Sequence, residues 1–70
     1  MKIISKTTNP EKVCYLISQE ENLFTLTNYL DERGNATLSM LFDETGMHIR
    51  DHLIITEFQE FVVNTQKTNQ

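Results

Sequence analysis

The stretch LDERGNATLSMLFDETGM, residues 30–47, decides the fold because it contains one short pattern twice. DERG at residues 31–34 is followed by DETG at residues 43–46. An aspartate can accept hydrogen bonds from the backbone ahead of it, and a glycine readily takes the left-handed conformation that closes a type I turn with a bulge. These two glycines are the only ones in the chain. The pattern therefore predicts two hairpin turns, with a strand between them over residues 36–42.

The segments before the first turn have the composition of strands. VCYLIS and LFTLTNYL are rich in β-branched and aromatic residues, which favour extended structure. A helix is the alternative within residues 10–33, since Ser18 followed by Glu21 fits a capping box and Gly34 fits the position after a last helical turn. We prefer strands, because they explain both turns by one mechanism.

The spacing of the apolar residues changes after Ile55 from alternation to a helical period. Thr56 followed by Gln59 fits a capping box, and Phe58 and Phe61 would then pack into the core. The sequence thus predicts an α+β fold, a four-stranded antiparallel meander with a C-terminal helix packed on one face. The predicted strands cover about residues 12–18, 23–30, 36–42 and 47–55, and the predicted helix covers about residues 57–66. KIIS at residues 2–5 is a candidate edge strand, and residues 1–70 form one small domain whose tail frays from about residue 66.

The parity of strand pairing predicts which face each residue takes. A three-residue loop after Asp31 places Phe42 on the apolar face that packs against the helix. The same loop after Asp43 would pair Phe42 with His48 and so place a histidine on the buried face. A register shifted by one residue would avoid this, because such a shift moves every side chain of a strand to the other face. We therefore expect the two turns to differ. The opposite face of the sheet then carries Tyr29, Leu41, His48, Arg50 and His52.

Length, charge and cysteine content set the class of protein. Seventy residues with 39% hydrophobic content suffice for one thin core. No apolar run reaches the roughly 20 residues of a membrane span, and the first residues lack the apolar region of a secretory signal. The single cysteine, Cys14, cannot form an internal disulfide and is expected to be a buried small apolar residue. We expect a cytoplasmic protein.

No catalytic, cofactor or metal site is predicted. His48 and His52 on one strand would lie about 13 Å apart, at 3.3 Å per residue, which is too far for a shared metal ion. Two isolated glycines cannot form a phosphate-binding loop, and paired acids at turn tips are too exposed for general-acid catalysis. We therefore expect that the protein is not an enzyme.

Four meandering strands and a helix, ending in HLIITEFQEFVVN at residues 52–64, resemble a PUR repeat or the related fold of single-strand-binding transcriptional coactivators. Leu53 and Phe58 imitate the family's aliphatic strand that runs into a phenylalanine-containing helix, and Gly34 after an arginine is similar to its turn glycine. The resemblance covers about residues 12–66. It implies single-stranded nucleic-acid binding on sheet aromatics beside basic residues, and dimerisation. The chain lacks the clustered lysines and arginines of these families.

Two functions are therefore expected as alternatives. The first is a small non-catalytic module that binds a protein, either a different partner or a second copy of itself, and a net charge of −4 suits a basic partner. The second is a PUR-like protein that binds single-stranded nucleic acid. Both would use the face predicted to carry Tyr29, Leu41, His48, Arg50 and His52.

Overall fold

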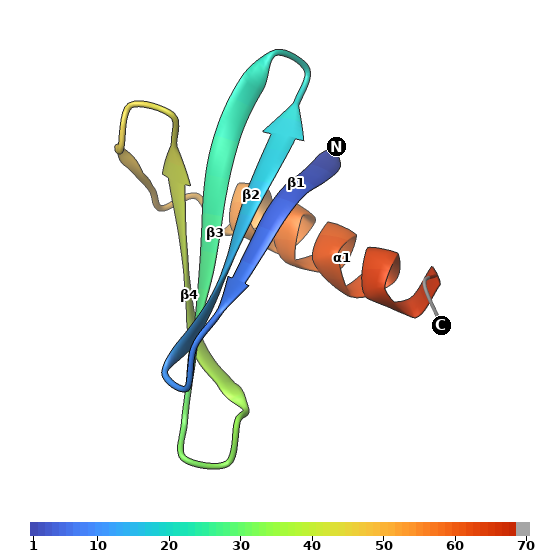
Figure 1. Ribbon diagram of the computed structural model, residues 1–70. Helices are drawn as coiled ribbons and strands as arrows, with labels where there is room; N and C mark the ends of the chain where they lie inside the picture. The colour runs from blue at the N-terminus through green and yellow to red at the C-terminus, as the bar shows by residue number, and fades with distance from the viewer. Residues whose placement is uncertain (69–70) are drawn as a thin grey trace.

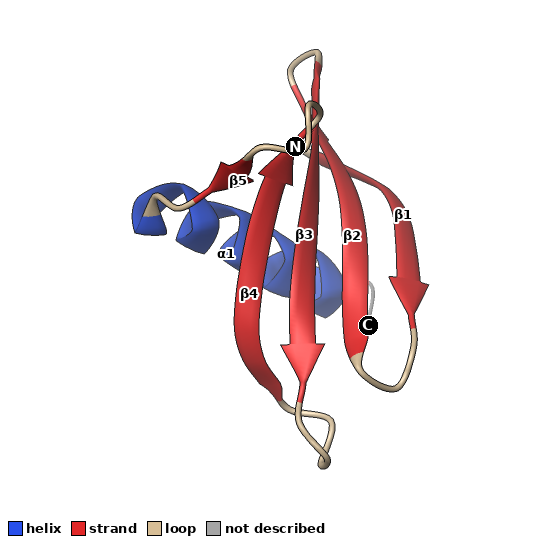
Figure 2. Ribbon diagram, turned by 90° about the vertical axis from the view of Figure 1, so that its left-hand side faces the viewer, coloured by secondary structure: helices blue, strands red, loops and turns tan. Residues whose placement is uncertain are grey.

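Each strand of the sheet pairs with the strand next to it in the sequence, in the order β1-β2-β3-β4-β5, and a helix follows (Figures 1 and 2). The computed structural model of the protein describes residues 1–68. All pairings are antiparallel. The elements are β1 (Lys2–Thr8), β2 (Lys12–Gln19), β3 (Asn22–Leu30), β4 (Ala36–Asp43), β5 (His48–Ile49) and α1 (His52–Thr68). The predicted α+β meander with a C-terminal helix is confirmed, and the alternative helix within residues 10–33 is wrong.

The predicted strand over residues 47–55 is wrong beyond its first residues. β5 ends at Ile49, and α1 begins at His52 rather than near residue 57. Asp51 caps the helix, because its Oδ1 accepts a hydrogen bond of 2.9 Å from the backbone N–H of Leu53. The predicted capping box at Thr56 is therefore wrong, since Thr56 lies inside the helix. The helix continues through Thr68, and the rest of the tail predicted to fray, residues 69–70, lies outside the described residues.

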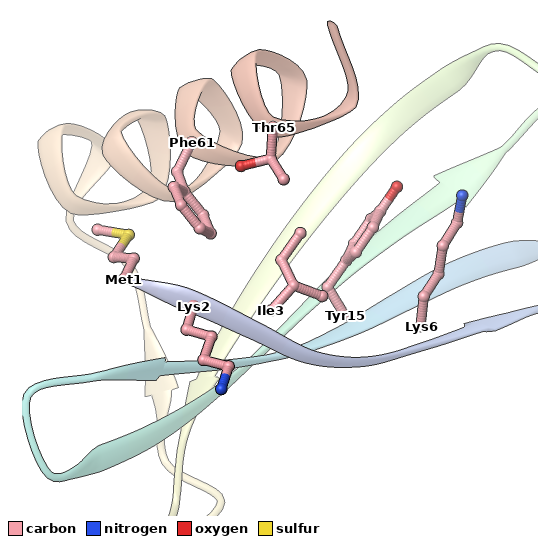
Figure 3. A pocket seen from close by; sticks show the side chains of 7 residues that line it. All are labelled: Met1, Lys2, Ile3, Lys6, Tyr15, Phe61 and Thr65. Atoms are coloured by element: carbon pink, nitrogen blue, oxygen red, sulfur yellow. The ribbon is translucent and has the colours of Figure 1, made fainter. Parts of the chain in front are cut away.

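The candidate edge strand at the N-terminus is present as β1. Lys2 pairs with Ser18 and Ile3 with Ile17, but the register shifts before Ser5. Ile4 is thus an extra residue that bulges from the strand. Figure 3 shows Ile3 directed toward α1, whereas Lys2 points away from the helix.

The two turns of the opening stretch have the same geometry, so the expected difference between them was wrong. Oδ1 of Asp31 and of Asp43 accepts hydrogen bonds of 2.9 Å from the backbone N–H groups two and four residues ahead. The N–H of Gly34 donates to the Asp31 carbonyl oxygen at 3.1 Å, and the N–H of Gly46 donates to that of Asp43 at 3.0 Å. Both glycines have left-handed backbone conformations, with φ of 84° and 87°.

A bulge at the start of β4 explains how identical turns fit one sheet. Leu30 pairs with Ala36, as predicted, but Tyr29 pairs with Leu38. Thr37 is therefore an extra residue, and its Oγ1 donates a hydrogen bond of 3.3 Å to the carbonyl oxygen of Tyr29. A bulge of this kind shifts all later residues of the strand by one position.

The bulge exchanges the two faces of β4 relative to the prediction. Leu26 faces Leu41 rather than Met40. Phe42 then lies on the face opposite the helix, where it pairs with His48 as the second turn requires. The predicted faces would be correct for an uninterrupted pairing of β3 and β4. They are wrong because Thr37 is an extra residue in β4.

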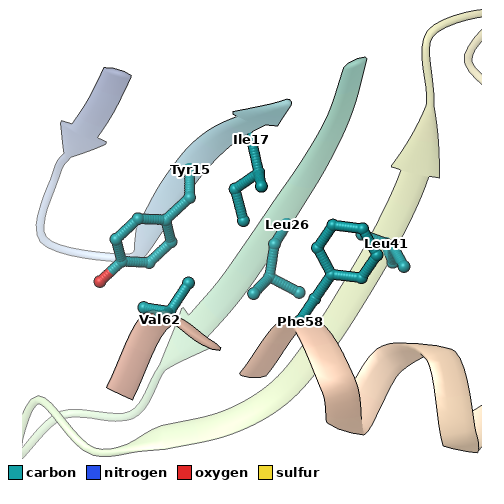
Figure 4. Packing of buried hydrophobic residues seen from close by; sticks show 6 residues of the cluster. All are labelled: Tyr15, Ile17, Leu26, Leu41, Phe58 and Val62. Atoms are coloured by element: carbon teal, nitrogen blue, oxygen red, sulfur yellow. The ribbon is translucent and has the colours of Figure 1, made fainter. Parts of the chain in front are cut away.

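The core lies between α1 and one face of the sheet (Figure 4). Phe58 is 1% exposed and packs against Phe24 with ring centroids 5.0 Å apart. Phe61 is partly buried and packs against the same cluster, which confirms that both phenylalanines belong to the core region. The buried apolar side chains are Tyr15, Ile17, Leu26, Leu41, Phe58 and Val62.

We expect deletion of Thr37 to preserve the fold. Ala36 would then be followed directly by Leu38, which closes the bulge while every residue from Leu38 onward keeps its partner on β3. The melting temperature, followed by circular dichroism, should fall by a few degrees at most. An alanine inserted between Met40 and Leu41 is the control, because it moves Leu41 out of the core and should lower the melting temperature far more. A severe loss on deleting Thr37 would contradict this account of the register.

Candidate interaction surface

The face of the sheet opposite α1 is covered by no other element among residues 1–68 (Figures 1 and 2). Alternation along each strand assigns its residues, since Tyr15, Leu26 and Leu41 point to the helix and their neighbours point away. We call this surface the open face. It carries Cys14, Leu16, Leu23, Thr25, Thr27, Tyr29, Leu38, Met40 and Phe42.

The open face carries large apolar side chains on β2, β3 and β4, together with threonines, Ser18 and Lys12. Leu38 is 56% exposed, whereas Thr27 at the centre is only 6% exposed because its neighbours cover it. A hollow of about 540 Å³ on this face is lined by residues that include Leu16, Tyr29 and Phe42. Antiparallel sheets that pack on one side usually present a polar face to solvent on the other. Exposed large apolar side chains gathered on one such face are typical of binding sites.

The open face has charged residues at opposite ends. Lys12 lies at one end of the hollow, and Asp43 and Glu44 lie at the other. Lys2 joins Lys12 on the side of β1 and β2, since it pairs with Ser18 on this face. The described surface therefore has one lysine at each end of the strands on the side of β1 and β2, and acids at the end of β4.

Two of the predicted site residues lie on the open face. Tyr29 is half-buried there, between its cross-strand partners Lys12 and Leu38. His48 is also half-buried, and its ring centroid lies 5.2 Å from that of Phe42. The structure thus brings Tyr29 and His48 to the predicted face.

The other three predicted positions are wrong. Leu41 is fully buried on the side of α1, because the bulge exchanges the faces of β4. Arg50 lies in the connection after β5, and His52 is the first residue of α1. Both are exposed, but neither belongs to a strand of the sheet.

The residues that sequence reasoning missed are Leu38, Met40 and Phe42. Within β4, these large apolar residues and Ala36 share one parity, whereas Leu41 is the only large apolar residue of the other. The usual rule assigns the more apolar set to the core. The sequence therefore shows that Leu38, Met40 and Phe42 share a face, but the usual rule places that face against the helix.

Cys14 also lies on the open face, where it is half-buried rather than buried as expected. The Oγ1 of Thr27 donates a hydrogen bond to its Sγ at 3.6 Å. The thiol therefore lies near the centre of the candidate surface.

A second hollow, of about 630 Å³, lies between β1 and α1 (Figure 3). Ile3, Tyr15 and Phe61 line it, and the Nζ of Lys6 lies 5.7 Å from the centroid of the Tyr15 ring. It is on the helix side of the sheet, at the margin of the core, and holds none of the predicted site residues.

The Asp43 turn at the rim of the open face is stabilised by charge. The Thr45 hydroxyl donates a hydrogen bond of 2.6 Å to the Asp43 carboxylate, and backbone N–H groups of Met47 and Thr45 donate two more. The hydroxyl first, and then these backbone donors, lower the pKa of Asp43 below its usual value. The ionised form is therefore the one that holds the turn.

We expect Thr45→Ala to raise the pKa of Asp43 toward its usual value, as measured by carboxyl-carbon NMR during a pH titration. Thr45→Ser keeps the hydroxyl and should keep the lowered pKa. Because the folded pKa is lowered, the carboxylate stabilises the protein above its unfolded pKa, and this contribution is lost as the pH falls through the folded value. Asp43→Asn should remove that part of the acid-induced loss of stability. An unchanged pKa in Thr45→Ala would show that the hydroxyl is not the main cause.

The described residues contain no group of three or more histidine, cysteine or acidic side chains placed to hold a metal ion. Within the same residues, no helix has both the length and the apolar character needed to cross a membrane.

Comparisons with protein-family models, with curated proteins and with solved structures found no match. The resemblance to PUR repeats thus stays a prediction from the sequence pattern.

Proposed function

We propose that the protein is a small non-catalytic binding or regulatory module that acts in the cytoplasm through protein–protein contact at its open face. The observation that supports this proposal is that large apolar side chains lie on both faces of the sheet, whereas α1 covers only one of them. Burying apolar surface gives about 25 cal/mol per Å², so a protein surface that covers Leu38, Met40 and Phe42 would gain free energy on binding.

The residue types of the open face also suit a protein partner. Tyr29 and Phe42 supply large side chains that bury much area with little loss of conformational entropy. Thr25 supplies a half-buried hydroxyl group beside Phe42, its cross-strand partner. Charged side chains lie at the rim rather than the centre, which is the usual arrangement of a protein interface.

Site-specific photo-crosslinking in the cells that produce the protein tests this proposal. A benzophenone amino acid at position 38 lies on the open face, and the same group at position 63 lies on α1 with similar exposure, 56% for Leu38 and 49% for Val63. We expect protein adducts from position 38 well above those from position 63, and their loss when Leu23→Glu places a charge on the same face. Equal yields from the two positions would contradict the proposal.

Single-stranded nucleic acid is the second candidate. Tyr29 and the Phe42–His48 ring pair are aromatic groups on which bases could stack, and this observation favours it. Lys2 and Lys12 are the cations of the described open face, and the acids at its other end oppose a phosphate backbone. Titration of labelled single-stranded DNA and RNA at two salt concentrations separates the candidates. Tight binding that weakens steeply with salt and is lost in Tyr29→Ala would favour nucleic acid over protein.

A further inference from the structure

We propose that the partner on the open face is a second copy of this chain, so that two sheets pack face to face about a two-fold axis. This inference rests on the proposed function and names the partner for the same surface. A two-fold interface uses one patch on both subunits, so the patch must be complementary to itself.

The charges of the open face meet that requirement. Two lysines, Lys2 and Lys12, lie on the side of β1 and β2, and two acids, Asp43 and Glu44, lie at the end of β4. Lys2 lies at the same end of the strands as Asp43, whereas Lys12 lies at the opposite end. A two-fold axis parallel to the strands therefore places Lys2 of one copy over the acids of the other. A strongly basic partner would instead be drawn to the surface outside this face, because the described face is balanced while the whole chain has a net charge of −4.

The accessible area of the chain is also larger than that of a compact monomer. The surface measures 5250 Å² for a mass of 8.2 kDa, whereas a folded monomer of this mass exposes about 4,500 Å². The difference is close to the roughly 800 Å² that each partner buries in an interface of standard size. Part of it comes from the end of α1, which extends away from the sheet in Figure 1. On the open face, Leu38 is 56% exposed and Leu23 is 40% exposed.

The edges of the sheet are less suited to self-association than its open face. β1 is the longer of the two edge strands, and it is interrupted by the bulge at Ile4 and carries Lys2 and Lys6. Bulges and lysines on an edge strand oppose pairing with another sheet. β5, at the other edge, has two residues and offers little backbone to pair. Contact between faces therefore fits the described residues better than extension of the sheet.

The mass of the purified protein in solution tests the inference. Size-exclusion chromatography with light scattering should give twice the 8.2 kDa mass of the chain. Leu38→Glu and Leu23→Glu, on two different strands of the open face, should each give the mass of one chain. The matched controls are Val63→Glu on α1 and Ile4→Glu on the β1 edge, which are similarly exposed and should keep the doubled mass. Far-UV circular dichroism checks that each variant is folded.

Cys14 gives a second readout in the unmodified chain, because its half-buried thiol lies on the open face. A second copy would cover the thiol, so its rate of reaction with a disulfide reagent should fall several-fold as protein concentration rises. In Leu38→Glu the rate should not depend on protein concentration. This measurement decides the question if one of the glutamate variants fails to fold.

Two results would overturn the inference. One is a wild-type protein that has the mass of one chain up to millimolar concentration, with a thiol reaction rate independent of concentration. The proposed function would survive that result if position 38 still crosslinked to a different protein. The other is a doubled mass that persists in Leu38→Glu and Leu23→Glu but is lost in Ile4→Glu, which would place the contact at the sheet edge.

Discussion

Leu41→Glu is expected to unfold the domain, whereas Met40→Glu, one residue earlier, is expected to leave it folded. Leu41 is 0% exposed and faces Leu26 beneath α1. A carboxylate there would be buried without a partner, at a cost on the order of 5 kcal/mol, which is comparable to the whole stability of a small domain. Met40 lies on the open face, where a glutamate side chain can reach water.

Far-UV circular dichroism and urea titration of the two variants measure this difference. The pair tests the face assignment directly, because the sequence alone predicted Met40 inside and Leu41 outside. A folded Leu41→Glu variant together with an unfolded Met40→Glu variant would restore the predicted faces and remove the bulge at Thr37 from the account.

Phe58→Ala is expected to cost about 3–5 kcal/mol, because it removes a fully buried ring and leaves a cavity between α1 and the sheet. The ring is in contact with Phe24 and belongs to the buried cluster of the core. Phe61→Ala is the matched control, since Phe61 lies on the same helix but is only partly buried, at the hollow beside β1.

We expect Phe61→Ala to cost roughly half as much, because less apolar area is lost from the packed interior. Urea titration compares the free energies of unfolding of the two variants, with one common slope of free energy against urea concentration. A larger loss for Phe61 than for Phe58 would mean that α1 is rotated about its axis relative to the described packing.

The parts of the fold that were predicted correctly depend on local chemistry. The two Asp-x-x-Gly turns form because an aspartate and a glycine at fixed spacing suffice to close them. The β-branched and aromatic content of residues 12–30 likewise favours strands without reference to the rest of the chain. The two turns and these strands are thus determined by residues that are close to one another in the sequence.

The register of β4 could not be predicted in the same way. Thr37 is an ordinary strand residue, and nothing beside it distinguishes a bulge from a regular ladder position. The bulge is favoured by distant packing, since it brings Leu41 under Phe58 and leaves Phe42 outside. That choice depends on which of two apolar sets fits the helix, and only the three-dimensional structure shows it.

The start of α1 was missed for a different reason. The apolar residues after His48 allow either strand or helix over so short a segment, and Leu53 at the first turn of α1 is exposed rather than buried. The deciding residue is Asp51, whose side chain caps the helix. Because Arg50 and His52 fall outside the strand that was predicted to hold them and Leu41 lies on the other face, only Tyr29 and His48 lie on the face that was predicted to hold all five residues.

The position of α1 at the C-terminal side of the sheet matters for how the chain is made. Synthesis runs from the N-terminus, so β1 to β4 are made before residues 52–68, and the sheet lacks its helix until those residues dock. During that interval both faces of the nascent sheet are without cover, including the side chains of Tyr15, Ile17 and Leu41 that the helix later buries. A neighbouring nascent chain could then occupy the wrong face. Docking of the helix is thus the step that distinguishes the two faces, and chains truncated before residue 52 are expected to aggregate.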